Sequence, residues 1–372
     1  MQHTKRRLAM FVGLLAVVGL AAACSSDSKT TTSSGSSSGS SSSSSVAGLS
    51  IDYSKLSGTL NGSGSSFQDP FNQKVITDFK TVAPSVSVTY TKSGSGAGKT
   101  DLQNKVVQFA GTDSTIAPAD LPKYTGGTVL YFPTVAAPIT VSYNLSGVTK
   151  LQLSGETLGG IFAGTITTWN DPKIAADNSG VTLPSTPIVV VHRSDASGTT
   201  SNFTKFLKAA GGAAWTLGSG DTVQWPATTQ GAEKNSGVAS VISSTPGAVG
   251  YVDLADSANA KLSTASVKNK AGKFIEPKLP GATAALDNTT LNADLTYDPI
   301  NAAGDASYPI TSPTWIIAYQ TQPDQATMSS LQGFLNYILT DGQKVANSVG
   351  YASLPSSFVQ AAVTQLSTLK VG

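Results

Sequence analysis

The chain has few of the residues that build disulfides, metal centres and catalytic triads. Its 372 residues include one cysteine, Cys24, and two histidines, His3 and His192. A single cysteine forms no disulfide within the chain. Two histidines so far apart give no zinc cluster, and only His192 would remain for a Ser/His/Asp triad once a leader containing His3 is removed. We therefore expect no His-based metal site and no Ser/His/Asp triad. We also expect no cofactor and no enzymatic activity, with the alternative given below.

Charged residues are also scarce, at 12% of the chain, and beyond the N-terminal KRR at 5–7 no run of lysine and arginine occurs. Proteins that bind nucleic acid usually present a basic field. Nucleic acid is therefore not an expected partner. Arginine occurs only at Arg6, Arg7 and Arg193, so Arg193 is the single guanidinium beyond the N-terminal segment.

The N-terminus has the pattern of an export signal. Lys5, Arg6 and Arg7 precede an apolar run at 8–20, which has the length of a signal peptide and is short for a membrane span. The sequence LAAAC, ending at Cys24, is similar to a lipobox. We expect 1–23 to be a signal peptide and Cys24 to be lipidated. An ordinary secretory peptide and a membrane anchor are the alternatives.

A serine-rich segment separates this signal from the body. Residues 25–45 are almost all Ser, with some Gly, Thr, Asp and Lys, and such a composition buries too little apolar area to fold. We therefore expect 24–50 to be a lipidated cysteine followed by a disordered tether. Loss of the leader's three basic residues changes the formal net charge from +2 to −1, so an anionic ligand must be captured by local hydrogen bonds.

The body, from 51 to the C-terminus, alternates strand-like and helix-like patterns, which predicts an α/β fold with mixed sheets. Its length suits two domains. Pro133-Thr134 and Tyr308-Pro309 are the expected crossings between them. The predicted strands are 85–91, 129–132, 139–143, 188–191, 248–252 and 315–319. The predicted helices are 70–79, 100–109, 200–209, 326–349 with a break at Gly342, and 356–369.

The most informative stretch is TPIVVVHRSDASGTTSNFT at 186–204, in which an apolar strand ends in a polar loop that begins a helix. The first N–H groups of a helix have no intrahelical partner and carry partial positive charge. A guanidinium, hydroxyls and a glycine in the same loop suit a tetrahedral oxyanion. Asp195 would either hold Arg193 in place or face an anion that carries a proton.

Two other loops have the same chemistry, GSGSSF at 62–67 and SGSGAGKT at 93–100. Each offers hydroxyls and glycine-rich backbone before a helix. The second is nearly a P-loop, with Ser93 in place of the first glycine, so a nucleotide-binding protein is an alternative. The missing glycine and the lack of a second carboxylate strand for magnesium count against it. A turn that binds a smaller anion fits better.

With these loops, the chain resembles the substrate-binding protein of the bacterial high-affinity phosphate ABC transporter. The matching segments cover most of the body. They are GSGSSF at 62–67, the Gly-Ser loop at Ser95, VQFAGTDS at 107–114, TLGGIFAGTITTWNDPKI at 157–174, HRSDASGTT at 192–200, PGAVGYVD at 246–253, YPITSPTWI at 308–316 and GYASLP at 350–355.

The resemblance implies a two-lobe, type II periplasmic-binding-protein fold with the ligand in the cleft between lobes. Lobe I would comprise 51–135 and 310–372, and lobe II would comprise 136–309. Donors would come from both lobes, with Asp113 as the acidic acceptor and Asp195 paired to Arg193. The implied phosphate donors are Ser66, the backbone N–H of Phe67, Ser95, Arg193, Ser197, Gly198 and Thr199.

The resemblance also implies function and location. The protein would bind inorganic phosphate as a monomer on the outer face of the cytoplasmic membrane and deliver it to ABC permease subunits. Phosphate keeps a proton at neutral pH and sulfate does not, so Asp113 would accept a hydrogen bond from phosphate and repel sulfate.

Alternatives remain from other classes of protein. An exported phosphohydrolase would use Ser95 or Ser197 as its nucleophile, and a structural surface lipoprotein would use none of these loops. Two neighbours of the loops have weaker assignments. His192 is expected to serve strand packing. Whether Lys99 faces the site stays open: an exposed lysine is the more common case at a helix start, and the phosphate-binding interpretation makes Lys99 peripheral.

Overall fold

The structure is a computed structural model that describes residues 46–372. The predicted signal peptide at 1–23, the lipidation of Cys24 and most of the predicted tether therefore lie outside the described residues. In the part of the chain that is described, no helix is long and apolar enough to cross a membrane.

Mixed β-sheet forms the centre of the described chain. The main sheet has the order β2 (Val86–Thr91), β1 (Gly58–Gly64), β3 (Phe109–Thr112), β12 (Thr311–Tyr319), β4 (Val129–Tyr143), β8 (Ala248–Asp253), β6 (Val189–Arg193) and β7 (Gln230–Ala232), and β9 (Ser263–Thr264) pairs with β4. Two small sheets contain β5 (Gln152–Leu153), β10 (Ser266–Lys268) and β11 (Phe274–Ile275), and β13 (Thr321–Gln322) and β14 (Lys370–Val371).

Helices flank this sheet. The α-helices are α1 (Asp69–Val82), α2 (Ser95–Gln103), α3 (Gly155–Phe162), α4 (Pro172–Asp177), α5 (Gly198–Ala210), α6 (Lys234–Ser244), α7 (Leu254–Asn259), α8 (Leu279–Asp287), α9 (Gln325–Leu339), α10 (Asp341–Val345) and α11 (Ser356–Leu366). Short 3₁₀ helices lie at η1 (Tyr53–Lys55), η2 (Pro118–Lys123), η3 (Gly212–Ala214) and η4 (Ala346–Val349).

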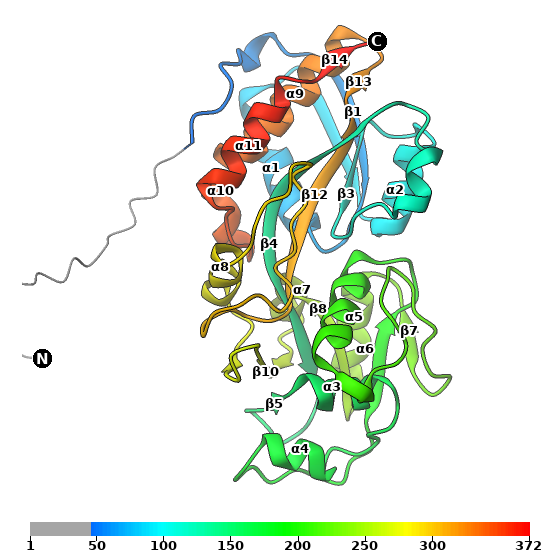
Figure 1. Ribbon diagram of the computed structural model, residues 1–372. Coiled ribbons are helices and arrows are strands. Elements are labelled where there is room, and N and C mark those ends of the chain that lie inside the picture. Colours follow the sequence, from blue (N-terminus) through cyan, green and yellow to red (C-terminus); the bar gives the residue numbers. More distant parts are fainter. Residues whose placement is uncertain (1–45) are drawn as a thin grey trace, which may run out of the picture. The chain divides into compact units, whose positions relative to one another are not determined.

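Strand β4 joins two lobes, and Figure 1 shows it running through both. Its first part, from Val129 to Pro138, pairs antiparallel with β12, and its last part, from Ile139 to Tyr143, pairs antiparallel with β8. Lobe I carries β1–β3 with α1, α2 and α9, and lobe II carries β6–β8 with α5 and α6. The predicted two-lobe α/β fold with mixed sheets is confirmed.

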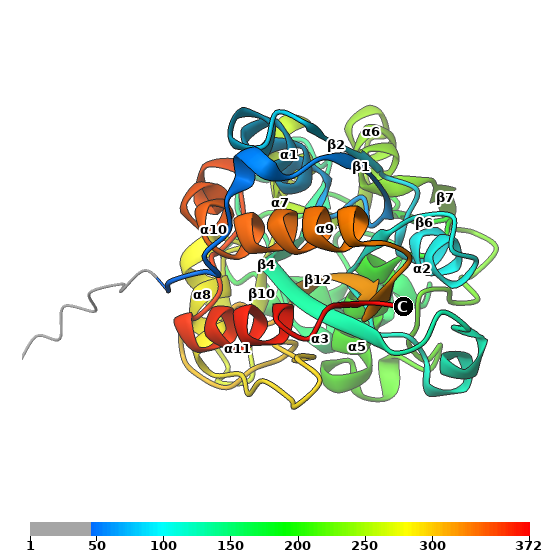
Figure 2. The same ribbon diagram turned by 90° about the horizontal axis from the view of Figure 1, so that it is seen from above.

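Apolar side chains at helical spacing hold lobe I together. Phe71, Val75 and Phe79 of α1 are fully buried, and the Phe79 ring packs on the Phe334 ring of α9 with a centroid distance of 5.3 Å. Figure 2 shows α9 and α11 beside one another, and both contact β4. Every residue of β12 is buried, which is typical of a central strand covered on both faces.

One predicted helix was wrong. Residues 100–109 were expected to be helical, but α2 begins at Ser95 and ends at Gln103, and Phe109 begins β3. Gly94 has φ +98°, a conformation that glycine adopts without strain, and it lets the chain turn into α2 five residues early. Lys105, with φ +59°, follows the end of the helix.

Other boundaries also differ. Strand β1 was not predicted, because GTLNGSG contains three glycines and little apolar surface. The predicted strands 129–132 and 139–143 are one strand, with Pro133-Thr134 inside it. Strand β12 begins at Thr311 instead of at 315, two residues after Pro309. The long C-terminal helix breaks at Thr340, two residues before Gly342.

Candidate functional site

Helices α2 and α5 begin close together from opposite lobes. The N–H of Gly96, in the first turn of α2, donates to the carbonyl of Ala196, just before α5, at 3.1 Å. A Cβ added to Gly198 would lie 2.7 Å from Ser95 Oγ and 2.8 Å from Asp113 Cβ. Only glycine fits there, so this residue type lets the two helix N-termini approach.

The loop after β1 brings the first predicted group to this junction. Ser65 Oγ lies 2.6 Å from both carboxylate oxygens of Asp113, and it accepts from the N–H of Phe67 at 3.0 Å. Ser66 Oγ accepts from the N–H of Asn235 in lobe II at 3.3 Å. The predicted Phe67 N–H is therefore engaged with Ser65, and the Ser66 hydroxyl contacts the opposite lobe.

Ser95 and Asp113 form the centre of the lobe I contribution. Asp113 follows β3 and is 1% exposed. Its N–H donates to Ser95 Oγ at 3.3 Å, and Ser95 Oγ lies 3.4 Å from Asp113 Oδ2. The two predicted residues are thus neighbours, although 18 positions separate them in the sequence.

Burial controls the protonation of Asp113. It raises the pKa of the carboxyl from 3.8 to about 7, against the lowering effects of the Ser65 hydrogen bond and the Arg193 charge. Removing a carboxylate from water disfavours its charged form, which explains the direction. Near neutral pH, the Asp113 carboxyl is therefore able to donate or accept a proton in a hydrogen bond.

Arg193 comes from lobe II, at the end of β6, and its side chain is 1% exposed. Its Nε and Nη2 donate to Asp195 at 2.7 and 2.5 Å, and its Nη1 donates to Asn235 Oδ1 at 3.0 Å. Burial alone would raise the pKa of Asp195, but the hydrogen bond and charge of Arg193 and the N–H of Lys234 hold this pKa below its usual value. Asp195 thus pairs with Arg193 as predicted.

The start of α5 supplies the remaining predicted groups. Ser197 is the N-cap, and its Oγ accepts from the N–H of Thr200 at 3.2 Å. Thr199 Oγ1 lies 3.5 Å from Arg193 Nη1. The N–H groups of Gly198 and Thr199 lie in the first turn, where no intrahelical acceptor exists. They donate to no other atom of the described chain.

Sequence reasoning missed two asparagines that join the loops. Asn235, at the start of α6, is fully buried, contacts Arg193 and Ser66, and donates from Nδ2 to Thr199 Oγ1 at 3.3 Å. Asn202 of α5 donates from Nδ2 to the carbonyl of Asp113 at 2.7 Å. Neither has a sequence signal, because a single polar residue near a helix start is ordinary capping material.

Two neighbours of the loops have other roles. His192 stacks on Trp225 with a centroid distance of 4.9 Å, and burial lowers its pKa, so the packing interpretation fits. Lys99, whose position the sequence left open, is partly buried. Its side chain is 14% exposed, and its Nζ lies 2.7 Å from Asp221 Oδ2 of lobe II. Because Lys99 is paired with this carboxylate, the contact does not favour the role of a P-loop lysine, which binds nucleotide phosphates.

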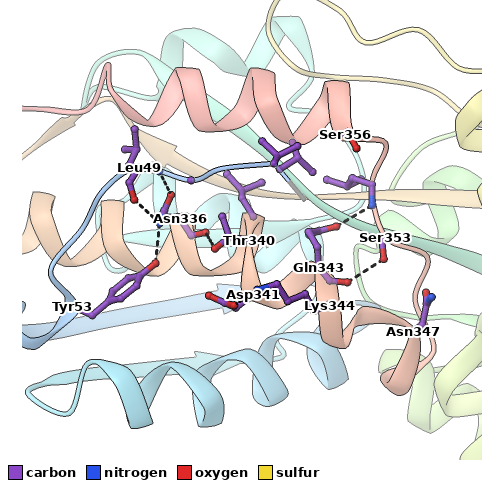
Figure 3. Close-up of a pocket in the computed structure, with 15 residues that line it drawn as sticks. Leu49, Tyr53, Asn336, Thr340, Asp341, Gln343, Lys344, Asn347, Ser353 and Ser356 are labelled. Atoms are coloured by element: carbon purple, nitrogen blue, oxygen red, sulfur yellow. Dashed lines mark hydrogen bonds and ion pairs between the residues drawn. The ribbon is translucent and has the colours of Figure 1, made fainter. Parts of the chain in front are cut away.

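A separate cavity of about 590 Å³ lies in lobe I, where the segment from Val46 to Tyr53 passes the C-terminal half of α9. Figure 3 shows Asn336 of α9 directed at this segment, with its Oδ1 accepting from the N–H of Leu49 at 2.8 Å. None of the predicted site residues lines this cavity, so it is distinct from the junction of the anion loops.

The junction as a whole collects hydrogen-bond donors. All nine predicted binding residues lie at or next to it, together with Ser65, Asn202 and Asn235. Unpaired helix-start N–H groups, hydroxyls and one guanidinium suit a small oxyanion. Within 46–372, no cluster of His, Cys, Asp and Glu could hold a metal ion. Fold and site together define a two-lobe binding protein for a small ligand.

Comparisons with known proteins agree with this class. The model of the PBP superfamily domain matches residues 28–342. The phosphate-binding protein PstS of Xylella fastidiosa is 33% identical over 307 residues, covering 81% of this chain and 83% of its own length. Phosphate-binding protein PstS 2 of Mycobacterium tuberculosis is 33% identical over 314 residues, covering 80% and 84%.

Solved structures show the same fold. A high-affinity periplasmic phosphate-binding protein (PfluDING), solved with phosphate bound, is similar with a TM-score of 0.70 and 23% identity, covering 82% of this chain and 93% of its own. A phosphate-binding protein from Stenotrophomonas maltophilia has a TM-score of 0.66 and 20% identity, with coverage of 82% and 93%. The chain belongs to the PstS family of phosphate-binding proteins, within the PBP superfamily.

Proposed function

We propose that this protein binds inorganic phosphate outside the cytoplasmic membrane with high affinity and delivers it to an ABC permease for uptake. The observation that carries the proposal is the position of Asp113. Its buried carboxyl lies beside Ser95, and α5 of lobe II begins against it. The names of the curated relatives support the same ligand.

The phosphate would lie between the two helix starts. Donors would be the backbone N–H groups and hydroxyls of the three loops and the free part of the Arg193 guanidinium. Hydrogen bonds to charged groups contribute about 1.5–3 kcal/mol each, and micromolar affinity needs roughly −8 kcal/mol. Four to six such bonds are of the right size. The proposed binding residues are Ser66, Phe67, Ser95, Asp113, Arg193, Asp195, Ser197, Gly198 and Thr199.

In its ionised form, Asp113 would select phosphate over sulfate. Phosphate at neutral pH keeps a proton that the carboxylate accepts in a hydrogen bond. Fully ionised sulfate would place an oxygen with no proton against the same buried group. A site built around such a hydrogen bond rejects an analogue lacking it by on the order of 10⁴.

Closure of the lobes would bury the ligand. The proposed lobe I comprises 51–135 and 310–372, and the proposed lobe II comprises 136–309. Two contacts support a closed arrangement: Asn202 Nδ2 to the Asp113 carbonyl at 2.7 Å, and the Asn235 N–H to Ser66 Oγ at 3.3 Å. Each of these two hydrogen bonds joins a residue of lobe I to a residue of lobe II next to the anion loops.

The anchoring proposal rests on the sequence. Cleavage before Cys24 and its lipidation would attach a monomeric protein to the outer face of the membrane, and the serine-rich tether would let the body reach its permease. The exported phosphohydrolase is not favoured, because the curated relatives are named as binding proteins. Ser197 Oγ, moreover, already caps α5.

Equilibrium dialysis of the purified protein against labelled phosphate tests the proposal. Binding of one phosphate per chain that a thousandfold excess of sulfate does not displace is the expected result. Binding that sulfate displaces as well as phosphate does would contradict the role of Asp113, and no saturable binding would contradict the function.

A further inference from the structure

One ion pair links the two lobes beside the proposed phosphate site. Lys99 of α2, in lobe I, and Asp221, in the lobe II segment between η3 and β7, approach to 2.7 Å. Their side chains are 14% and 21% exposed, whereas eight of the ten ion pairs within 46–372 include a side chain that is 40% exposed or more. Such shielding makes an ion pair less sensitive to solvent screening.

Lys99 and Asp221 are each connected to residues of the proposed phosphate site. On lobe I, Lys99 Nζ also donates to Ser114 Oγ at 3.0 Å, next to Asp113, and Lys99 lies one helical turn after Ser95. On lobe II, the carbonyl of Asp221 accepts from the N–H of Ser197, the N-cap of α5, at 2.9 Å. Each member of the pair is therefore one bond or one turn from an anion-binding group.

The charge of the pair also reaches the site. The carboxylate of Asp221 is among the groups that raise the pKa of Asp113, so its field extends to the place where an anion would bind. Lys99 neutralises this carboxylate while the lobes are together. An opening motion that separates the pair leaves Asp221 unpaired beside the departing anion.

We propose that Lys99 and Asp221 form a latch that holds the two lobes closed and sets the rate of phosphate release. The proposal rests on the proposed function and adds two positioning residues that do not touch the ligand. The contact between Lys99 and Asp221 is absent when the lobes are open, because the two residues belong to different lobes. It should therefore act on dissociation, the step in which most affinity differences between related complexes arise.

The chain contains a matched control. Lys123 and Asp120 form an ion pair at 2.6 Å within lobe I, with side chains 59% and 47% exposed. Both pairs line the same cavity of about 480 Å³. Lys123→Met thus removes the same charge from the same region without breaking a contact between lobes.

The test measures phosphate association and dissociation by stopped flow for the parent, Lys99→Met, Asp221→Asn, the double variant and Lys123→Met. We expect Lys99→Met and Asp221→Asn each to raise the dissociation rate about tenfold, equivalent to about 1.4 kcal/mol. Association should stay within about threefold, because the open form has no latch to lose. The double variant should resemble the stronger single variant, since both remove one contact.

Three results would overturn the latch. Dissociation rates of both single variants within twofold of Lys123→Met would show that the Lys99–Asp221 pair does not slow phosphate release. Effects that multiply in the double variant would show that the two residues act independently. A parent that binds no phosphate would overturn the latch together with the proposed function, whereas the first two results overturn the latch alone.

Discussion

Replacing Arg193 with alanine is the most informative perturbation of the site. Arg193 is the single arginine in 46–372, and its side chain is buried. Its Nε and Nη2 hold Asp195, and its Nη1 holds Asn235. The substitution removes a donor from the ligand and also leaves the carboxylate of Asp195 without its guanidinium beside the anion.

The size of the effect follows from the burial of this pair. Truncating a buried charged group that hydrogen-bonds a charged partner across a binding site costs about 2–5 kcal/mol of binding free energy, part of which is the cost of leaving the other charge unpaired. Asp195 retains the N–H of Lys234 at 3.0 Å, and its side chain is 17% exposed, so the lower half of the range applies. About 3 kcal/mol corresponds to phosphate affinity that is about 100-fold weaker.

Isothermal titration calorimetry with phosphate measures this change, and thermal unfolding without ligand checks the fold. Lys205→Ala is the matched control, because Lys205 lies on the same helix, α5, in an exposed pair with Asp298. It removes the same charge and should leave affinity within about threefold, the scale of an exposed pair. A loss below tenfold for a folded Arg193→Ala would refute the assignment of Arg193 to the site.

Three further predictions concern selectivity, pH and anchoring. Asp113→Asn keeps an acceptor for a phosphate hydroxyl and loses the repelling charge, so phosphate binding should weaken modestly while sulfate begins to compete in titrations; unchanged rejection of sulfate would exclude Asp113 as the discriminator. Because burial raises the pKa of Asp113 from 3.8 to about 7, ionisation destabilises the folded state. Without phosphate, the parent should therefore lose on the order of 4 kcal/mol relative to Asp113→Asn as the pH rises from about 4 to about 8, measured by urea unfolding; a difference independent of pH would contradict the raised pKa. Cys24→Ala should release the protein from membranes or block leader cleavage without changing phosphate affinity, as cell fractionation and titration will show; a cleaved variant that stays on the membrane would argue against lipidation.

Local sequence signals were sufficient for much of the fold and of the candidate site. The strand before Arg193 and the helix after it follow from an apolar β-branched run, a polar loop and apolar residues at helical spacing. The glycines at 94, 96 and 198 mark places where the backbone of one lobe approaches the other. These features can be predicted from the sequence because each depends on residues that are adjacent in the chain.

The contacts between lobes were not predictable in the same way. Asn235 and Asn202 reach groups that lie 169 and 89 positions away in the sequence, and no local pattern specifies such partners. The sequence left the position of Lys99 open for the same reason, because its partner Asp221 is 122 positions away. Strand β1 was missed because its stability comes from pairing with β2 and β3 and not from its own residues.

Ligand-induced stabilisation of the purified parent tests the central claim most directly. A ligand that binds only the folded state raises the unfolding temperature, and the rise grows with the logarithm of the ligand concentration once that concentration exceeds the Kd. Inorganic phosphate should raise the melting temperature clearly at millimolar concentration, and equal concentrations of sulfate, or of ATP with magnesium, should leave it unchanged. Stabilisation by ATP with magnesium and not by phosphate would contradict the account and return the loop at 93–100 to a nucleotide-binding role.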